Sequence, residues 1–67
     1  MNFGENLKQA RKRAKVTQKE LAEALGVYQK DISRWENEEV VPNVLVFATI
    51  CRILHASADE ILEIRKE

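Results

Sequence analysis

The hydrophobic residues of this chain recur at helical spacing in short segments, and the pattern predicts five helices. The first segment carries four apolar residues on one face, namely Phe3, Leu7, Ala10 and Ala14. Its other positions are largely basic, and Asn2, followed three residues later by Glu5, suits the start of a helix. The first element is therefore predicted to be an amphipathic helix with a positively charged flank.

The second predicted helix has the most clearly marked boundaries in the chain. Thr17 and Glu20 have the spacing of a capping box, in which a hydroxyl and a carboxylate each accept a bond from a free backbone amide. Gly26 suits the left-handed residue that follows a helix end. The inward positions between these two signals are Leu21, Ala22 and Leu25.

A third helix, from about Gln29 to Asn37, is predicted to begin after only two more residues. Its large apolar side chains are Ile32 and Trp35, which lie three positions apart and therefore share one face. We expect both to be core residues. A helix with so narrow an apolar stripe displays its remaining polar side to a partner or to solvent.

The last two helices are separated from the third by a loop that begins at Glu38 and contains Pro42. Asn43 is a candidate cap for a fourth helix, Val44 to His55, which is apolar almost all round. We expect its inward residues to be Val44, Phe47, Ala48, Cys51 and Leu54. Ser57 and Glu60 have capping-box spacing and predict a fifth helix. Its inward residues are expected to be Ala58, Ile61 and Leu62.

Composition narrows the class of protein. With 67 residues, of which 45% are hydrophobic, the chain fits one ordered domain over residues 1–67. Two glycines and one proline leave little room for the turns of an all-β fold. The single cysteine, Cys51, excludes an internal disulfide and a zinc site built on paired thiolates. A domain this small also fits a piece of a longer protein.

The chain also lacks the signals of a membrane or secreted protein. No apolar run approaches about 18 residues, and the amino terminus does not have the order of a signal peptide. We therefore expect a compact all-α protein of the cytoplasm, without a membrane partner.

Charge is distributed unevenly although the formal net charge is zero. Residues 1–34 contain eight basic and four acidic side chains, whereas residues 35–67 contain three basic and seven acidic ones, so the halves carry +4 and −4. Such a split is typical of a face that binds a polyanion, and it is equally compatible with an ordinary solvated helix face.

The central stretch TQKELAEALGVYQKDISRWENEE, residues 17–39, resembles the helix-turn-helix of the phage repressor/Cro-type (XRE-like) DNA-binding family. The ending SADEIL resembles the last helix of that family, and the resemblance extends from about Phe3 to Ile64. It implies a compact five-helix repressor-type domain with the helix-turn-helix at about residues 17–37. It also implies a transcriptional regulator that binds double-stranded DNA with sequence specificity, needs no cofactor and associates with the nucleoid.

The resemblance assigns roles to individual residues. The helix from Gln29 would enter the major groove, with four side chains reading bases: Gln29, Lys30, Ser33 and Arg34. Glutamine can pair with adenine at two points, whereas lysine and arginine prefer guanine. The candidate phosphate contacts are Gln18, Arg13, Lys15, Lys19, Asn37 and Asn43. Arg11 and Glu36 occupy positions that often form a partly buried ion pair in the family, where the pair orients helices more than it stabilises them.

Several positions depart from the family pattern. Tyr28 stands where a serine or threonine cap is usual, and Asp31 is expected to interact with the positive end of its own helix. Glu38 and Glu39 replace the glycine and basic residues that are common in that loop, so we expect modest DNA affinity from one copy.

The fourth helix predicts a homodimer. Leu45, Val46 and Ile53 hold apolar side chains where the family pattern has polar ones, and a second copy is the simplest cover for them. The alternative is that the fifth helix covers this stripe through Ile61 or Ile64.

An alternative function uses the same fold. The acidic loop and the apolar fourth helix also suit a protein-interaction module, such as an antitoxin-like or anti-repressor partner. Cys51 and His55 are interpreted as a core residue and a helix-end residue. The sequence contains no catalytic constellation and indicates no metal or small-molecule ligand, so we do not expect an enzyme.

Overall fold

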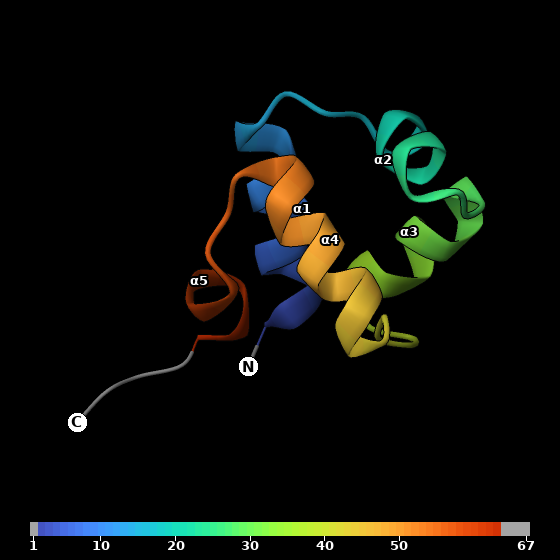
Figure 1. Ribbon diagram of the computed structural model, residues 1–67. Coiled ribbons are helices and arrows are strands. Elements are labelled where there is room, and N and C mark those ends of the chain that lie inside the picture. The colour runs from blue at the N-terminus through green and yellow to red at the C-terminus, as the bar shows by residue number, and fades with distance from the viewer. Residues whose placement is uncertain (1, 64–67) are drawn as a thin grey trace.

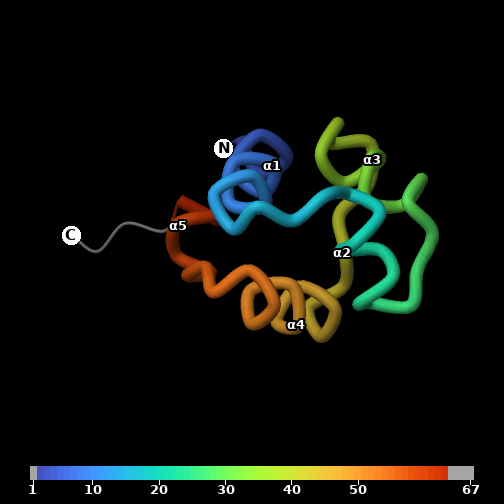
Figure 2. The backbone as a smooth tube through the Cα atoms, turned by 90° about the horizontal axis from the view of Figure 1, so that it is seen from above, coloured from blue at the N-terminus to red at the C-terminus, as the bar shows by residue number. Residues whose placement is uncertain are grey.

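The computed structural model describes residues 2–63 of the chain, and within them it forms five α-helices joined by short loops (Figure 1). The helices are α1 (Phe3–Arg13), α2 (Gln18–Leu25), α3 (Gln29–Glu36), α4 (Val44–Leu54) and α5 (Ala58–Leu62). Figure 2 shows α1 and α4 on opposite sides of the molecule, with α5 at one end and α2 and α3 at the other. The predicted all-α fold is confirmed.

Local capping explains where α2 and α4 begin. The Thr17 hydroxyl accepts a bond of 3.0 Å from the Glu20 amide, and the Glu20 carboxylate accepts one of 2.9 Å from the Thr17 amide. Gly26 ends α2 with a φ of +73°, in the left-handed region that glycine adopts at little steric cost. The Asn43 side chain accepts a bond of 2.9 Å from the Val46 amide at the start of α4. These three signals were readable in the sequence and are confirmed.

The start of α1 is capped differently from the sequence-based expectation. Asn2 occupies the cap position, but its side chain makes no capping bond. A carboxylate oxygen of Glu38 accepts a bond of 3.1 Å from the Gly4 amide instead. Glu38 adopts a φ of +63°, in the left-handed region, so a residue interpreted as a surface charge joins the loop after α3 to α1.

The start of α5 also corrects the expected capping box. The Ser57 hydroxyl accepts its bond from the Asp59 amide, at 3.1 Å, rather than from Glu60. A carboxylate oxygen of Glu60 lies 3.6 Å from Nη2 of Arg13 on α1. The helix begins where predicted, but its glutamate faces another helix.

The buried apolar side chains form one core to which all five helices contribute, and they include Ile32 and Trp35 as predicted. The members are Phe3, Leu7, Ala10, Leu21, Ala22, Ile32, Trp35, Ile50, Leu54 and Ile61.

The orientation of α4 differs from the prediction. Val44 is 76% exposed and Ala48 is exposed, whereas Ile50 is completely buried beside Leu54 in the core. Phe47 and Cys51, which were also expected to face inward, are half-buried and pack against the core. A helix that is apolar on nearly every side has no pattern to fix its rotation, so packing against the other helices determines which residues face inward.

The fifth helix packs beside α1, where Ile61 is buried and its carbonyl accepts a bond of 3.0 Å from Asn6. Leu45 on α4 stays 78% exposed, so the described part of α5 does not cover it. Ile64, the other residue considered for that cover, lies outside the described residues. None of the helices in the described chain is long and apolar enough to cross a membrane.

Candidate nucleic-acid interface

The turn between α2 and α3 places the two helices in the arrangement of a helix-turn-helix. Gly26 reverses the chain, and Val27 and Tyr28 lead directly into α3. The Asp31 carboxylate accepts a bond of 3.1 Å from the Tyr28 amide, which satisfies a free backbone group at the positive end of α3. The Tyr28 ring projects into solvent and is 81% exposed.

The two sides of α3 differ sharply in character. Ile32 and Trp35 are buried in the core. On the opposite side Gln29, Lys30 and Arg34 are exposed, and Ser33 is half-buried. The structure therefore presents all four candidate base-reading side chains on the outward surface of one helix.

The buried ion pair expected between Arg11 and Glu36 is present in the structure. Nε of Arg11 lies 2.6 Å from one carboxylate oxygen of Glu36, and Nη2 lies 3.1 Å from the other. Nη1 of Arg11 donates to the Val16 carbonyl at 3.0 Å. Because the Arg11 and Glu36 side chains are only 10% and 4% exposed, the pair fixes the end of α3 against α1 in a water-poor setting.

Gln18 extends this pair to the outer surface of α3. Its Nε2 donates to Glu36 at 3.0 Å, and its Oε1 accepts from Gln29 at 3.4 Å. A continuous chain of hydrogen bonds, here called the polar network, thus runs from Arg11 through Glu36 and Gln18 to Gln29. The sequence pattern indicated a phosphate role for Gln18 but gave no sign of these contacts.

The remaining candidate phosphate contacts are all exposed, and they are spread over several elements: Arg13 and Lys15 at and after the end of α1, Lys19 on α2, Asn37 after α3 and Asn43 before α4. Two have neighbours that would compete with a phosphate. Arg13 faces Glu60 across 3.6 Å, and the Asn37 amide donates to Ser33 at 3.5 Å. The Arg13–Glu60 pair is largely solvated, so the attraction between its charges is weak.

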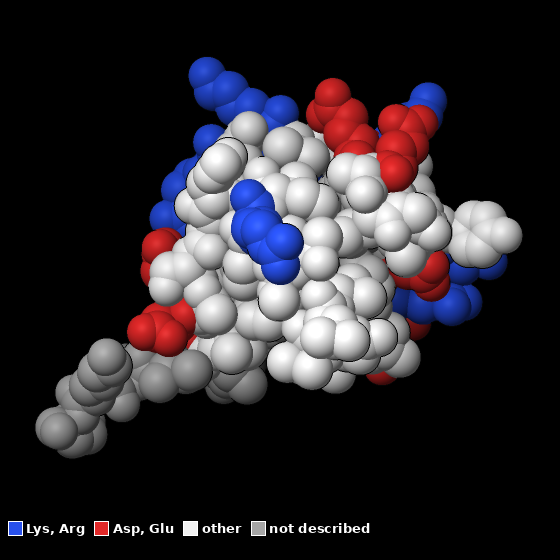
Figure 3. Space-filling view, in the orientation of Figure 1, with Lys and Arg blue, Asp and Glu red and all other residues white. Residues whose placement is uncertain are grey.

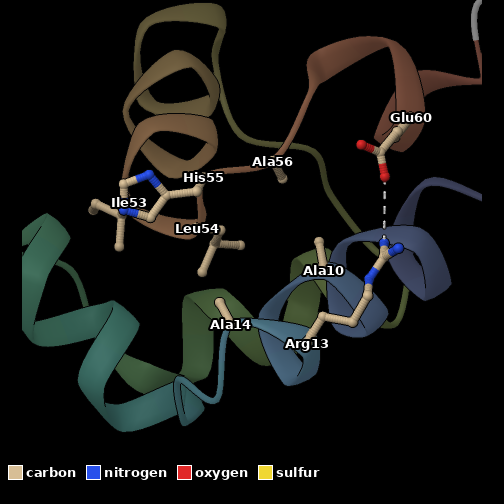
Figure 4. Close-up of a pocket in the computed structure, with 8 residues that line it drawn as sticks. All are labelled: Ala10, Arg13, Ala14, Ile53, Leu54, His55, Ala56 and Glu60. Atoms are coloured by element: carbon tan, nitrogen blue, oxygen red, sulfur yellow. Dashed lines mark ion pairs between the residues drawn. The ribbon is translucent and has the colours of Figure 1, made fainter.

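Two of the hollows in the surface of residues 2–63 are each several hundred Å³ in volume. One of about 370 Å³ lies on α3 itself and is lined by Tyr28, Lys30, Asp31 and Arg34. The other, of about 410 Å³, lies between the ends of α1 and α4 and α5 (Figure 4). Its lining residues are Ala10, Arg13, Ala14, Ile53, Leu54, His55, Ala56 and Glu60. Of the described residues expected to contact DNA, Arg13 alone lines the hollow of about 410 Å³, so that hollow is separate from the surface of α3.

The surroundings of Cys51 and His55 indicate structural roles for both residues. Cys51 is half-buried against the core, and this burial raises the pKa of its thiol. His55 follows α4 with a φ of 52°, which makes it the left-handed residue at the end of that helix. Within residues 2–63, no three His, Cys, Asp or Glu side chains are grouped closely enough to hold a metal ion.

The fold and the polar surface of α3 define a helix-turn-helix domain. The profile of the family described as "Helix-turn-helix domain" matches residues 4–64, and the chain belongs to this helix-turn-helix family of DNA-binding domains. The chain is similar to the HTH-type transcriptional activator BcrR of Enterococcus faecalis, with 37% identity over 62 residues. The match covers 92% of this chain and 30% of that relative, so the chain spans less than a third of the relative's length. No solved structure matches the chain significantly.

Proposed function

We propose that this domain binds double-stranded DNA with sequence specificity and regulates transcription, with α3 in the major groove. The observation that carries the proposal is the outward surface of α3, where Gln29, Lys30 and Arg34 are exposed while Ile32 and Trp35 hold the helix to the core. These exposed side chains can form two-point bonds with the edges of adenine and guanine. The relative's description as a transcriptional activator supports a regulatory role.

Phosphate contacts would position α3 on the duplex. The start of α2, with its free amides and with Lys19 exposed, suits a phosphate because the positive end of a helix attracts an anion. The exposed side chains of Arg13, Lys15, Asn37 and Asn43 would contribute sequence-independent affinity. A DNA-binding role would place the domain in the cytoplasm, in association with the nucleoid.

Selection from a random duplex pool, followed by a salt titration of the enriched sequence, tests this function. Specific binding predicts an enriched half-site and an affinity that falls as salt rises, because each phosphate contact releases counterions. The triple variant Gln29→Ala/Lys30→Ala/Arg34→Ala should lose the enrichment. Gln9→Ala, which alters an exposed glutamine on α1 that bonds to Glu5 at 2.7 Å, should keep it.

A protein-interaction role is the second candidate, because Val44 and Leu45 expose large apolar surfaces on α4. The same selection separates the two functions. A pool that shows no enrichment, together with a tight complex between the chain and another protein, would favour the interaction module over the DNA-binding regulator.

A further inference from the structure

We propose that the outer face of α4 binds a second copy of this chain, with the two α4 helices packed antiparallel about a twofold axis. The centre of the face is the apolar patch formed by Val40, Val41, Val44 and Leu45. Ala48, Thr49 and Arg52 continue the same face toward the end of the helix.

The apolar patch is unusual for the surface of so small a domain. Val41, Val44 and Leu45 are 70–78% exposed, and they are close in sequence, just before and within the first turn of α4. Figure 3 shows the surface over α4 as a mostly uncharged area with blue, basic atoms near its centre. Contiguous exposed apolar surface of this kind marks sites of protein interaction. Val46 and Ile53, expected from the sequence to share a dimer contact with Leu45, are half-buried against the core and can supply only its edges.

Charge complementarity argues for a second copy as the occupant and for the antiparallel direction. Glu39 precedes the apolar patch and Arg52 lies in the last turn of α4; both are exposed, and neither forms an ion pair within the described part of the chain. Antiparallel helices bring Glu39 of each copy to the Arg52 end of the other, so the favourable pairing occurs twice. Parallel helices would bring like charges together at both ends.

The middle of the face suits close packing of two helices. When the helices run antiparallel, Leu45 of one copy faces the small side chain of Ala48 in the other. The hydroxyl of Thr49 donates to the Leu45 carbonyl at 3.2 Å, so covering it leaves no unsatisfied donor. A twofold interface is formed by the same surface on both partners. This face carries both members of each proposed contact, the leucine and the alanine as well as the glutamate and the arginine.

This dimer also fits the proposed function, although the pairing itself does not depend on DNA binding. The twofold axis would lie in the plane of the outer face and perpendicular to α4. In Figure 1 that direction points toward α2 and α3, so both copies of α3 would lie on the same side of the dimer.

Sedimentation velocity of the full chain without DNA, from low to high micromolar concentration, tests the pairing. The wild type should sediment as a dimer at the upper end, and Leu45→Glu should stay monomeric with an unchanged circular dichroism spectrum. Tyr28→Ser is the matched control, because Tyr28 is as exposed as Leu45 but lies outside the apolar patch. The control should keep the wild-type dimer.

Charge reversal tests the antiparallel direction. Glu39→Arg and Arg52→Glu should each raise the dimer dissociation constant on the order of tenfold, because each reversal places like charges together twice. An equimolar mixture of the two variants should recover the dimer, since a mixed pair restores opposite charges at both ends.

Wild-type chain that remains monomeric at the highest concentration would overturn the proposal. A wild-type dimer unaffected by Leu45→Glu would show that another surface pairs. A mixture that fails to recover the dimer would refute the antiparallel arrangement. Because no DNA is present, each of these results stands apart from the outcome of the duplex selection.

Discussion

Gln29 is the candidate base-reading side chain on α3 that joins the polar network, because its amide nitrogen lies 3.4 Å from the oxygen of Gln18. If it reads a base, Gln29→Ala should cost about 1–3 kcal/mol on the selected site and little on random DNA. Competition binding with both duplexes measures the difference. Equal weakening on selected and random duplexes would remove Gln29 from the base-reading set.

Gln18 tests whether the polar network supports base reading. A phosphate contact alone predicts that Gln18→Ala weakens all duplexes alike. Its bonds to Glu36 and Gln29 predict in addition that the two glutamines are coupled. The double variant Gln18→Ala/Gln29→Ala should therefore lose less discrimination than the sum of the single variants, by about 0.5–3 kcal/mol. Strictly additive losses would mean that the two side chains act independently.

At the scale of the elements, the approach of α1 to the end of α3 depends on Gly4. A methyl group at this position would overlap the backbone carbonyl of Glu36. Gly4→Ala should lower the free energy of unfolding by about 1–3 kcal/mol, measured by urea denaturation.

Gly26 is the matched glycine, since it has open space around its Cα and needs only a left-handed backbone. Asparagine tolerates that conformation, so Gly26→Asn should destabilise the domain less than Gly26→Ala does. Gly4→Asn should be at least as damaging as Gly4→Ala. If the asparagine variant were more stable than the alanine variant by the same amount at both positions, steric overlap at Gly4 would be the wrong explanation.

Glu38 has a strained backbone conformation, and its carboxylate forms a hydrogen bond that stabilises the start of α1. Its left-handed φ is unfavourable for a side chain by about 1–2 kcal/mol, and its bond to the Gly4 amide offsets that strain. Glu38→Ala loses the bond and keeps the strain, so it should lower the free energy of unfolding by about 1 kcal/mol. Glu38→Gly loses both and should stay near the wild type. Identical melting curves for the two variants would contradict this account.

These elements also show what the sequence could predict. Thr17, Glu20 and Gly26 act within a few residues of one another, so the boundaries of α2 were readable locally. The contact between Gly4 and Glu38 joins positions 34 residues apart and leaves no local pattern. The same limit applies to the rotation of α4, where Ile50 is buried and Val44 is exposed because the other helices select the inward side.

For the whole molecule, the Arg11–Glu36 pair connects the core to the proposed reading surface. The residue types at these positions indicated the pair, but its links to Gln18 and Gln29 depend on how α2 packs against α3. A buried ion pair seldom adds much stability over apolar side chains of similar size, although removing one partner is strongly unfavourable. Stability and DNA discrimination should therefore respond differently to changes in the pair.

Arg11→Met leaves the nearly buried Glu36 carboxylate without its arginine and should lower the free energy of unfolding by about 3–5 kcal/mol. The double variant Arg11→Met/Glu36→Leu removes both charges and should return to within about 1–2 kcal/mol of the wild type, with the lost bond to the Val16 carbonyl as the residual cost. It also removes the acceptor that holds Gln18, so its preference for the selected duplex over random DNA should fall although the domain remains folded. Urea denaturation and competition binding on the same preparations measure both quantities. A double variant that regained stability and kept full discrimination would show that the polar network does not position Gln29.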